Sequence, residues 1–117
     1  MGGLWWAVLS CVVVLGGCAG TDPATEYLED AEALRRGESV FVGTCSGYCH
    51  AEGVTAGEAP DLFDAEWKYG GSNRDIYATI SNGVPDTPMI GFEGKLPDGD
   101  EDIWKIVAFL RSRGPGG

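Results

Sequence analysis

The run Cys45-Ser46-Gly47-Tyr48-Cys49-His50 is the feature that most constrains how this chain folds. It brings two thiols close to the single histidine of the 117 residues. The 19 glycines and 6 prolines predict short helices and much loop, so the apolar core should be small for the length. A chain of this kind needs a stabilising group beyond its core, and the two thiols with the imidazole are a place to bind one.

The run has four chemical interpretations. The first is covalent attachment of haem c, in which each thiol forms a thioether with the haem and the following imidazole ligates the iron. Its usual signature has two residues between the cysteines, whereas three residues separate Cys45 and Cys49. The second is a thioredoxin-like redox pair, which normally lies in a βαβ pattern that this sequence does not show. A zinc site would require a further ligand cluster, and a lone disulfide would stabilise little.

The N-terminal segment has the pattern of an export signal. Leu4–Leu15 is almost wholly apolar, but it is shorter than the roughly 20 residues that span a bilayer as a helix. The following Leu15-Gly16-Gly17-Cys18 resembles the lipobox of bacterial lipoproteins, in which the cysteine is lipidated and becomes the first residue. We therefore expect residues 1–17 to be removed and Cys18 to anchor the protein in a bacterial cell envelope. Ordinary signal cleavage and an uncleaved anchor are the alternatives.

Charge and composition narrow the possible partners. The chain has 18 acidic against 8 basic residues and a formal net charge of −10. The negative electrostatic field of such a chain repels nucleic acid and anionic membrane surfaces. It favours a protein partner with a basic docking surface. Removal of the signal would leave Met89 as the only methionine.

Apolar spacing predicts an all-α domain of three or four short helices. The first covers residues 30–44, and Gly37 in its middle would let another helix approach closely. Tyr27 extends it backward from a cap at Asp22-Pro23. The second covers residues 72–81, with Ser72 or Asn73 as its cap and Asn82-Gly83 as its end.

The last helix has the strongest helical pattern. Asp98 and Glu101 have the spacing of a capping box, and Gly114-Pro115 ends the helix. We expect its Trp104 and Phe109 to pack across Gly37 and Phe41. The predicted organisation is a signal at 1–17, a lipidated cysteine and tether at 18–29, one folded domain at 30–114 and a frayed tail at 115–117.

The order of these elements resembles small class I cytochromes c over nearly all of residues 30–113. The stretches that carry the resemblance are Gly37-Glu38-Ser39-Val40-Phe41 before the cysteine run, Ala59-Pro60-Asp61-Leu62, Thr87-Pro88-Met89, and residues 102–112 in the last helix. The resemblance implies one covalent haem c on Cys45 and Cys49, iron ligation by His50 and Met89, and a Pro60 carbonyl that accepts the imidazole proton.

Two features depart from the family pattern. The extra residue between the cysteines must bulge out, and Gly47 suits an unusual backbone there. Ile90 stands where many relatives have proline, which leaves the loop around Met89 less rigid. The rival distal ligands are water and three amines: Lys68, Lys95 and Lys105.

Four loop residues are weaker candidates. Residues of similar type approach the haem propionates in such loops, and simple core or surface roles are equally open; they are Trp67, Tyr69, Asn73 and Arg74. No Ser-His-Asp set, phosphate-binding loop or pair of carboxylates indicates an enzyme.

The sequence therefore predicts a single-electron carrier: a lipid-anchored mono-haem cytochrome c that exchanges electrons with redox proteins of the envelope. One alternative is a dedicated haem subunit of an envelope dehydrogenase, since Cys45–His50 looks like small cytochromes associated with quinoprotein alcohol dehydrogenases. A haem-based ligand sensor or peroxidase with a labile Met89 is the other.

Overall fold

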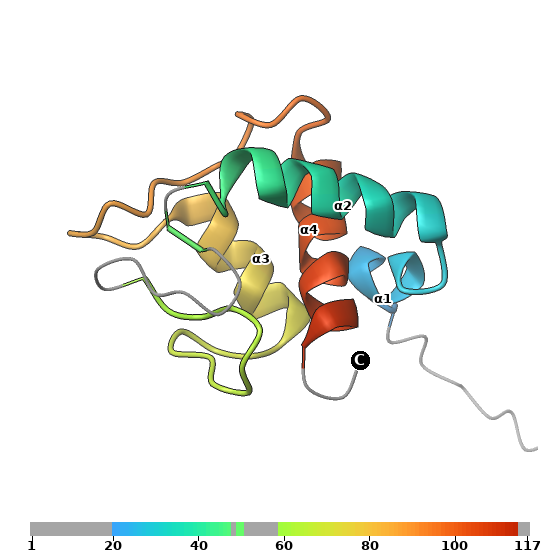
Figure 1. The fold of residues 1–117 in the computed structure, drawn as a ribbon, viewed down its shortest axis with the longest axis horizontal. Helices are drawn as coiled ribbons and strands as arrows, with labels where there is room; N and C mark the ends of the chain where they lie inside the picture. Colours follow the sequence, from blue (N-terminus) through green and yellow to red (C-terminus); the bar gives the residue numbers. More distant parts are fainter. Residues whose placement is uncertain (1–19, 48, 51–58, 115–117) are drawn as a thin grey trace, which may run out of the picture.

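The computed structural model describes residues 20–47, 49–50 and 59–114. The helices are α1 (Pro23–Tyr27), α2 (Ala31–Thr44), α3 (Asn73–Asn82) and α4 (Asp100–Arg113), and the described ranges contain no strand. The predicted all-α class is confirmed. Figure 1 shows α2 crossing α4, with α1 beside one end of α2 and α3 on the other side of α4. In the described part of the chain, no helix is long and apolar enough to cross a membrane.

The first three helices begin at side-chain caps. The Asp22 carboxylate accepts a hydrogen bond from the Thr25 N–H (3.0 Å), and Asp30 accepts from the first turn of α2. Ser72 and Asp75 form a complete capping box at α3. These carboxylate and hydroxyl oxygens satisfy N–H groups that have no partner within a helix. The predicted bounds of α2 and α3 are therefore confirmed to within a residue.

The N-terminal extension differs from the prediction. Residues 28–30 separate α1 from α2, so Tyr27 belongs to a helix of its own. Part of the expected tether is also folded, because Ala24 has no exposed surface and α1 packs against α4.

The start of α4 also differs from the prediction. Gly99, at φ 60°, is the N-cap, and no side chain caps this end. The predicted box of Asp98 and Glu101 does not form: Glu101 pairs instead with Lys105 (2.6 Å), and Asp102 accepts the Asp98 N–H (2.9 Å). Asp102 is held at this position by Arg36 of α2, whose guanidinium donates to both carboxylate oxygens at 2.8 Å. The contact between Arg36 of α2 and Asp102 of α4 thus forms in place of the predicted capping box.

The crossing of α2 and α4 forms the centre of the core. Gly37 lies so close to α4 that a Cβ there would be 2.1 Å from the Lys105 carbonyl oxygen. This close approach confirms the role predicted for Gly37. Beside it, the ring of Phe41 lies 5.5 Å from Phe109 and 5.7 Å from Phe63, centroid to centroid.

Trp104 does not take the place predicted for it on α2. Its ring stacks on Tyr77 of α3, with centroids 4.1 Å apart and planes 17° apart. Trp104 therefore fixes α3 against α4, while Phe109 packs on α2 as expected.

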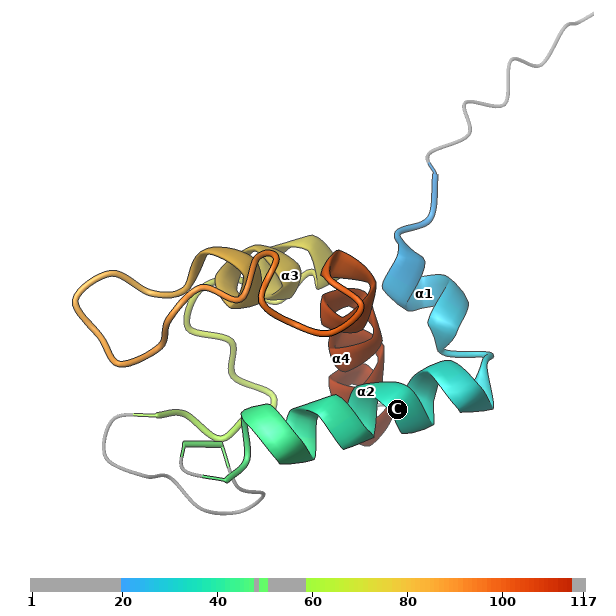
Figure 2. The same ribbon diagram turned by 90° about the horizontal axis from the view of Figure 1, so that it is seen from above.

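Two long loops complete the molecule. One leads from α2 to α3 and the other from α3 to α4, and both project from the same side in two perpendicular views (Figures 1 and 2). The first carries Cys45, Cys49, His50 and Pro60, and the second carries Met89. The helices thus bring the separate parts of the predicted site to one side of the fold.

Candidate functional site

The end of α2 places the first cysteine. Cys45 is the C-cap of the helix, and its N–H donates to the Phe41 carbonyl (2.7 Å), as does that of Ser46 (3.0 Å). The chain then turns back, since the His50 N–H donates to the Cys45 carbonyl (3.1 Å). Gly47 does not adopt a positive φ. Tyr48 lies outside the described residues.

The imidazole of His50 is oriented by the loop that follows. Its Nδ1 lies 3.1 Å from the carbonyl oxygen of Pro60. A carbonyl oxygen can only accept, so Nδ1 carries a proton, and in the neutral ring the lone pair is then on Nε2. A ring held in this tautomer is ready to ligate a metal through Nε2. The structure thus places Pro60 where the sequence resemblance implied.

The two thiols differ in environment. Cys45 is half-buried and packs against the core, whereas Cys49 is exposed. Burial, with a smaller contribution from Cys49, raises the pKa of the Cys45 thiol to about 11. No disulfide joins Cys45 to Cys49 in the structure. The described residues also contain no group of three His, Cys, Asp or Glu side chains placed to hold a metal ion.

Met89 lies half-buried in the second loop and packs against the core. The backbone around it is hydrogen-bonded, with the Val84 N–H donating to the Met89 carbonyl (3.0 Å) and the Met89 N–H to the Thr87 hydroxyl (3.2 Å).

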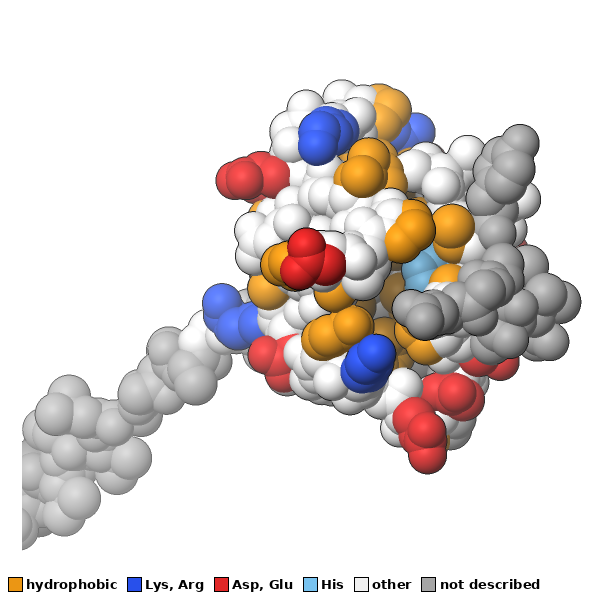
Figure 3. All heavy atoms as spheres, turned by 90° about the vertical axis from the view of Figure 1, so that its left-hand side faces the viewer, with side chains coloured by type: hydrophobic (Ala, Val, Ile, Leu, Met, Phe, Trp, Pro, Cys, Tyr) orange, Lys and Arg blue, Asp and Glu red, His pale blue; other side chains and the backbone are white. Residues whose placement is uncertain are grey.

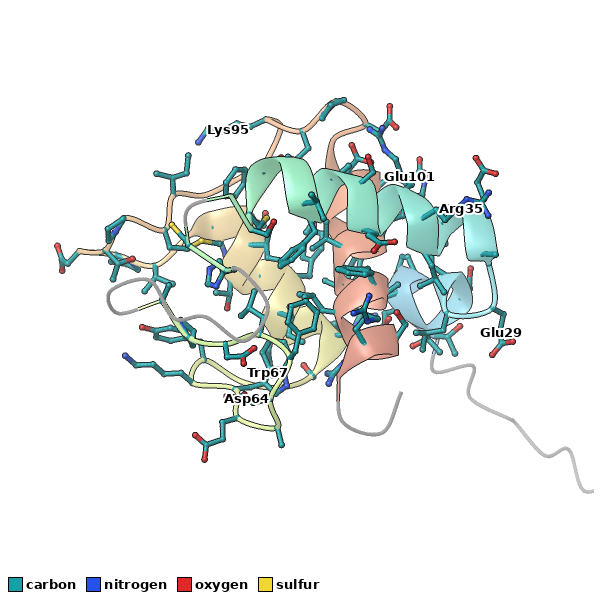
Figure 4. All side chains as sticks on the ribbon, in the orientation of Figure 1. Glu29, Arg35, Asp64, Trp67, Lys95 and Glu101 are labelled. Atoms are coloured by element: carbon teal, nitrogen blue, oxygen red, sulfur yellow. The ribbon has the colours of Figure 1, made fainter. Side chains whose placement is uncertain are left out.

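The three rival amines have other contacts. Lys105 forms an ion pair with Glu101 and lies 5.6 Å from the ring centroid of Tyr27, beside α1. Lys68 lies over Tyr69. Lys95 projects from the edge of the molecule in Figure 4, and its amine donates to the Gly91 carbonyl (2.6 Å).

The four weaker candidates differ in their surroundings. Asn73 is structural, because its amide donates to Asp22 (2.9 Å) and its oxygen accepts from Arg111 (2.7 Å). Arg74 is exposed, and so is Tyr69. Trp67 lies in the loop before α3 (Figure 4), with the Arg111 guanidinium 5.7 Å from its ring centroid.

Trp67 also borders a hollow on the surface. An open hollow of about 560 Å³ is lined by Pro60, Asp64, Glu66, Trp67 and Lys68. Arg111 of α4 was not among the residues singled out from the sequence. The Arg111 guanidinium donates to the Asn73 side-chain oxygen and to the Gly71 carbonyl, both far from Arg111 in the sequence. No local sequence pattern indicates such a contact.

The face that carries both loops is apolar around the histidine. Figure 3 shows hydrophobic side chains gathered about its pale blue surface, with acidic side chains at several places on this face, one of them well inside its edge. These surroundings fit haem c, which is a large and mostly apolar group. The thiols of Cys45 and Cys49 would attach it, and His50 and Met89 would supply ligands to its iron.

The crossing helices and this donor set define a small c-type cytochrome. A family model described as cytochrome C oxidase, cbb3-type, subunit III, matches residues 32–110, and the chain belongs to this family. Membership implies that it binds haem c covalently.

Individual relatives agree with this assignment. The chain is 39% identical to cytochrome c-L of Methylorubrum extorquens over 87 residues, which are 73% of this chain and 42% of that protein. It is 42% identical over 53 residues to the cbb3-type cytochrome c oxidase subunit FixP of Sinorhizobium medicae, covering 44% of this chain and 18% of FixP. The chain therefore spans less than half the length of either relative.

Solved structures share the fold. Cytochrome cL of Methylophaga aminisulfidivorans superposes with a TM-score of 0.63 and 27% identity, over 85% of this chain and 71% of that one. Cytochrome c6 of the diatom Phaeodactylum tricornutum superposes with a TM-score of 0.54 and 26% identity, over 66% and 88% of the respective chains. The crossing of α2 and α4 thus belongs to a cytochrome c fold.

Proposed function

We propose that this protein is a single-electron carrier with one haem c, attached through Cys45 and Cys49 and ligated by His50 and Met89. The observation that carries the proposal is the Pro60 carbonyl on Nδ1 of His50, because it leaves Nε2 free for iron beside the two thiols. When bound, the haem supplies an iron that cycles between ferrous and ferric states.

The side chains explain why transfer of electrons is favoured over catalysis. With His50 and Met89 as ligands, the iron would have no position left for a substrate. The two ligands would also rearrange little when the iron changes its oxidation state. The thioether of Met89 is a soft ligand that favours ferrous iron and therefore raises the potential. The apolar core residues that pack against Cys45 and Met89 lower the polarity around both side chains, which further disfavours the more charged ferric state.

Covalent attachment is tested by haem staining after denaturing electrophoresis of the protein matured with haem. We expect the stain to survive acid-acetone extraction, and Cys45→Ser with Cys49→Ser to abolish it. A stain that extraction removes from the wild type would contradict thioether attachment.

The location follows from the N-terminal sequence. We propose that lipid on Cys18 anchors the domain to a bacterial envelope membrane, facing the periplasm or the exterior. Residues 1–19 lie outside the described residues, so the proposal depends on Leu15-Gly16-Gly17-Cys18 alone. Cys18→Ser should release the protein or leave it unprocessed, and a mature wild-type mass without acyl groups would contradict the anchor.

The acidic surface supports redox partners with a basic docking surface. A second candidate is a dedicated haem subunit of an envelope redox complex such as a dehydrogenase. The match to proteins named as subunits of a cbb3-type oxidase favours membership of a complex. Purification from membranes in mild detergent separates the two, because a subunit should elute with its complex and a free carrier should elute alone.

A further inference from the structure

The loop that presents Met89 is closed at its base by direct backbone contact. We call residues 83–91 the distal loop. A Cβ on Gly83 would lie 2.5 Å from the Gly91 nitrogen, and one on Gly91 would lie 2.6 Å from the Ser81 carbonyl oxygen. The Phe92 N–H donates to the Ile80 carbonyl (2.9 Å), which joins the end of the loop to α3. The base of the loop is therefore fixed to a helix of the core.

Inside the distal loop, one side chain joins the two limbs. The Thr87 hydroxyl donates to the Val84 carbonyl (2.8 Å) and accepts the Met89 N–H (3.2 Å). The Val84 N–H donates in turn to the Met89 carbonyl (3.0 Å). Both polar backbone groups of Met89 are thus bonded within its own loop.

The backbone between these bonds is restricted. Pro85 and Pro88 each fix one φ angle, and Asp86 adopts φ 61°, a left-handed value that aspartate accepts more readily than most residues other than glycine. Such a turn persists only when its surroundings hold it. The Thr87 hydroxyl, which bonds both sides of the turn, is placed to do so.

We propose that Thr87 is a positioning residue for the Met89 thioether. By holding the Met89 backbone, its hydroxyl keeps the side chain directed at the iron and opposes opening of the loop. The inference rests on the proposed function, in which Met89 is the distal ligand. It adds that the Thr87 hydroxyl, two residues before Met89, sets how strongly the Met89 thioether binds the iron, without contacting the iron itself.

The effect can be measured as competition with an external ligand. Imidazole must displace Met89 before it binds ferric iron, so its apparent affinity rises as the closed loop becomes less stable. Thr87→Val removes the hydroxyl while keeping the branched shape. Because a typical hydrogen bond contributes about 1 kcal/mol, we expect imidazole to bind roughly fivefold to tenfold more tightly. Thr87→Ser, which retains the hydroxyl, should stay close to wild type.

Thr79→Val is the matched control. The Thr79 hydroxyl donates to the Asp75 carbonyl within α3 (3.0 Å), so the same atoms are removed outside the distal loop. Its imidazole affinity should equal that of the wild type. Amide hydrogen exchange of Met89 is the second readout, and Thr87→Val alone should lower its protection several-fold.

Three outcomes are informative. A rise in affinity and loss of protection confined to Thr87→Val would support the inference. Unchanged affinity and protection in Thr87→Val would overturn it, as would an equal change in all three variants. Met89→Ala separates this inference from the proposed function: if it leaves the spectrum of the ferric protein unchanged, Met89 is not the ligand, whatever Thr87 does.

Discussion

Gly37 provides the sharpest test of the fold, since α2 and α4 touch at this residue. A Cβ at position 37 would lie 2.1 Å from the Lys105 carbonyl oxygen and 3.1 Å from the Cβ of Phe109. Ordinary carbon contacts begin near 3.5 Å, so Gly37→Ala must move the helices apart by more than about 1 Å. Overpacking of this kind costs about 1 to 3 kcal/mol, and the obstacle here is backbone, which places the cost at the upper end.

Alanine also favours a helix over glycine by about 1 kcal/mol, which offsets part of the cost. We therefore expect Gly37→Ala to lower the free energy of unfolding by about 2 kcal/mol, a large part of the stability of a small domain. The assay is guanidinium unfolding of the haem-loaded protein, followed by far-ultraviolet circular dichroism.

Gly43→Ala is the control in the same helix. Nothing lies within 4 Å of a Cβ at Gly43, so only the helix preference acts. That variant should be more stable than the wild type by about 0.5 to 1 kcal/mol. If the two alanine variants shift stability in the same direction, the close crossing is wrong.

Two further perturbations test packing and charge. The hydrogen bonds from the Arg36 guanidinium are the largest influence on the buried Asp102 carboxyl, and they hold its pKa below the usual value. The ionised Asp102 therefore stabilises the fold above about pH 4, and this contribution is lost as the pH falls through the lowered pKa. Asp102→Asn should therefore cost about 2 to 3 kcal/mol of unfolding free energy at pH 7, and the difference from wild type should shrink below pH 4; a constant difference would contradict the pairing. For the stacked rings of Tyr77 and Trp104, a double-mutant cycle with leucine should give a coupling of about 0.5 to 1.5 kcal/mol, and a value near zero would refute the stack.

The sequence predicted the features that depend on neighbouring residues. The bounds of α2 and α3 follow from Asp30 and Ser72, whose side chains bond N–H groups two or three residues away. The role of Gly37 could also be predicted, because a glycine costs stability inside a helix unless something approaches it. The motif order was sufficient to propose the cofactor.

The remaining features depend on contacts between distant residues. The start of α4 was mispredicted because Arg36, far earlier in the chain, pairs with the Asp98 carboxylate (3.2 Å) as well as with Asp102, and no local pattern shows this contact. Trp104 was assigned to the wrong helix, since apolar spacing shows that a face is buried but does not show which element covers it. The same reason explains why Arg111 and the role of Asn73 were missed: the bond from Asn73 to Asp22 joins α3 to the N-terminal helix.

The central claim is that Met89 completes the coordination begun by His50, and redox titration with optical detection of the wild type and Met89→Ala tests it most directly. The wild type should show a reversible one-electron transition and, when ferric, the weak far-red band of sulfur bound to iron. Met89→Ala should lose that band and have a lower potential, because the soft ligand that favours ferrous iron is gone. An unchanged band and potential in Met89→Ala would contradict the account, and Lys95 would become the first alternative ligand to replace.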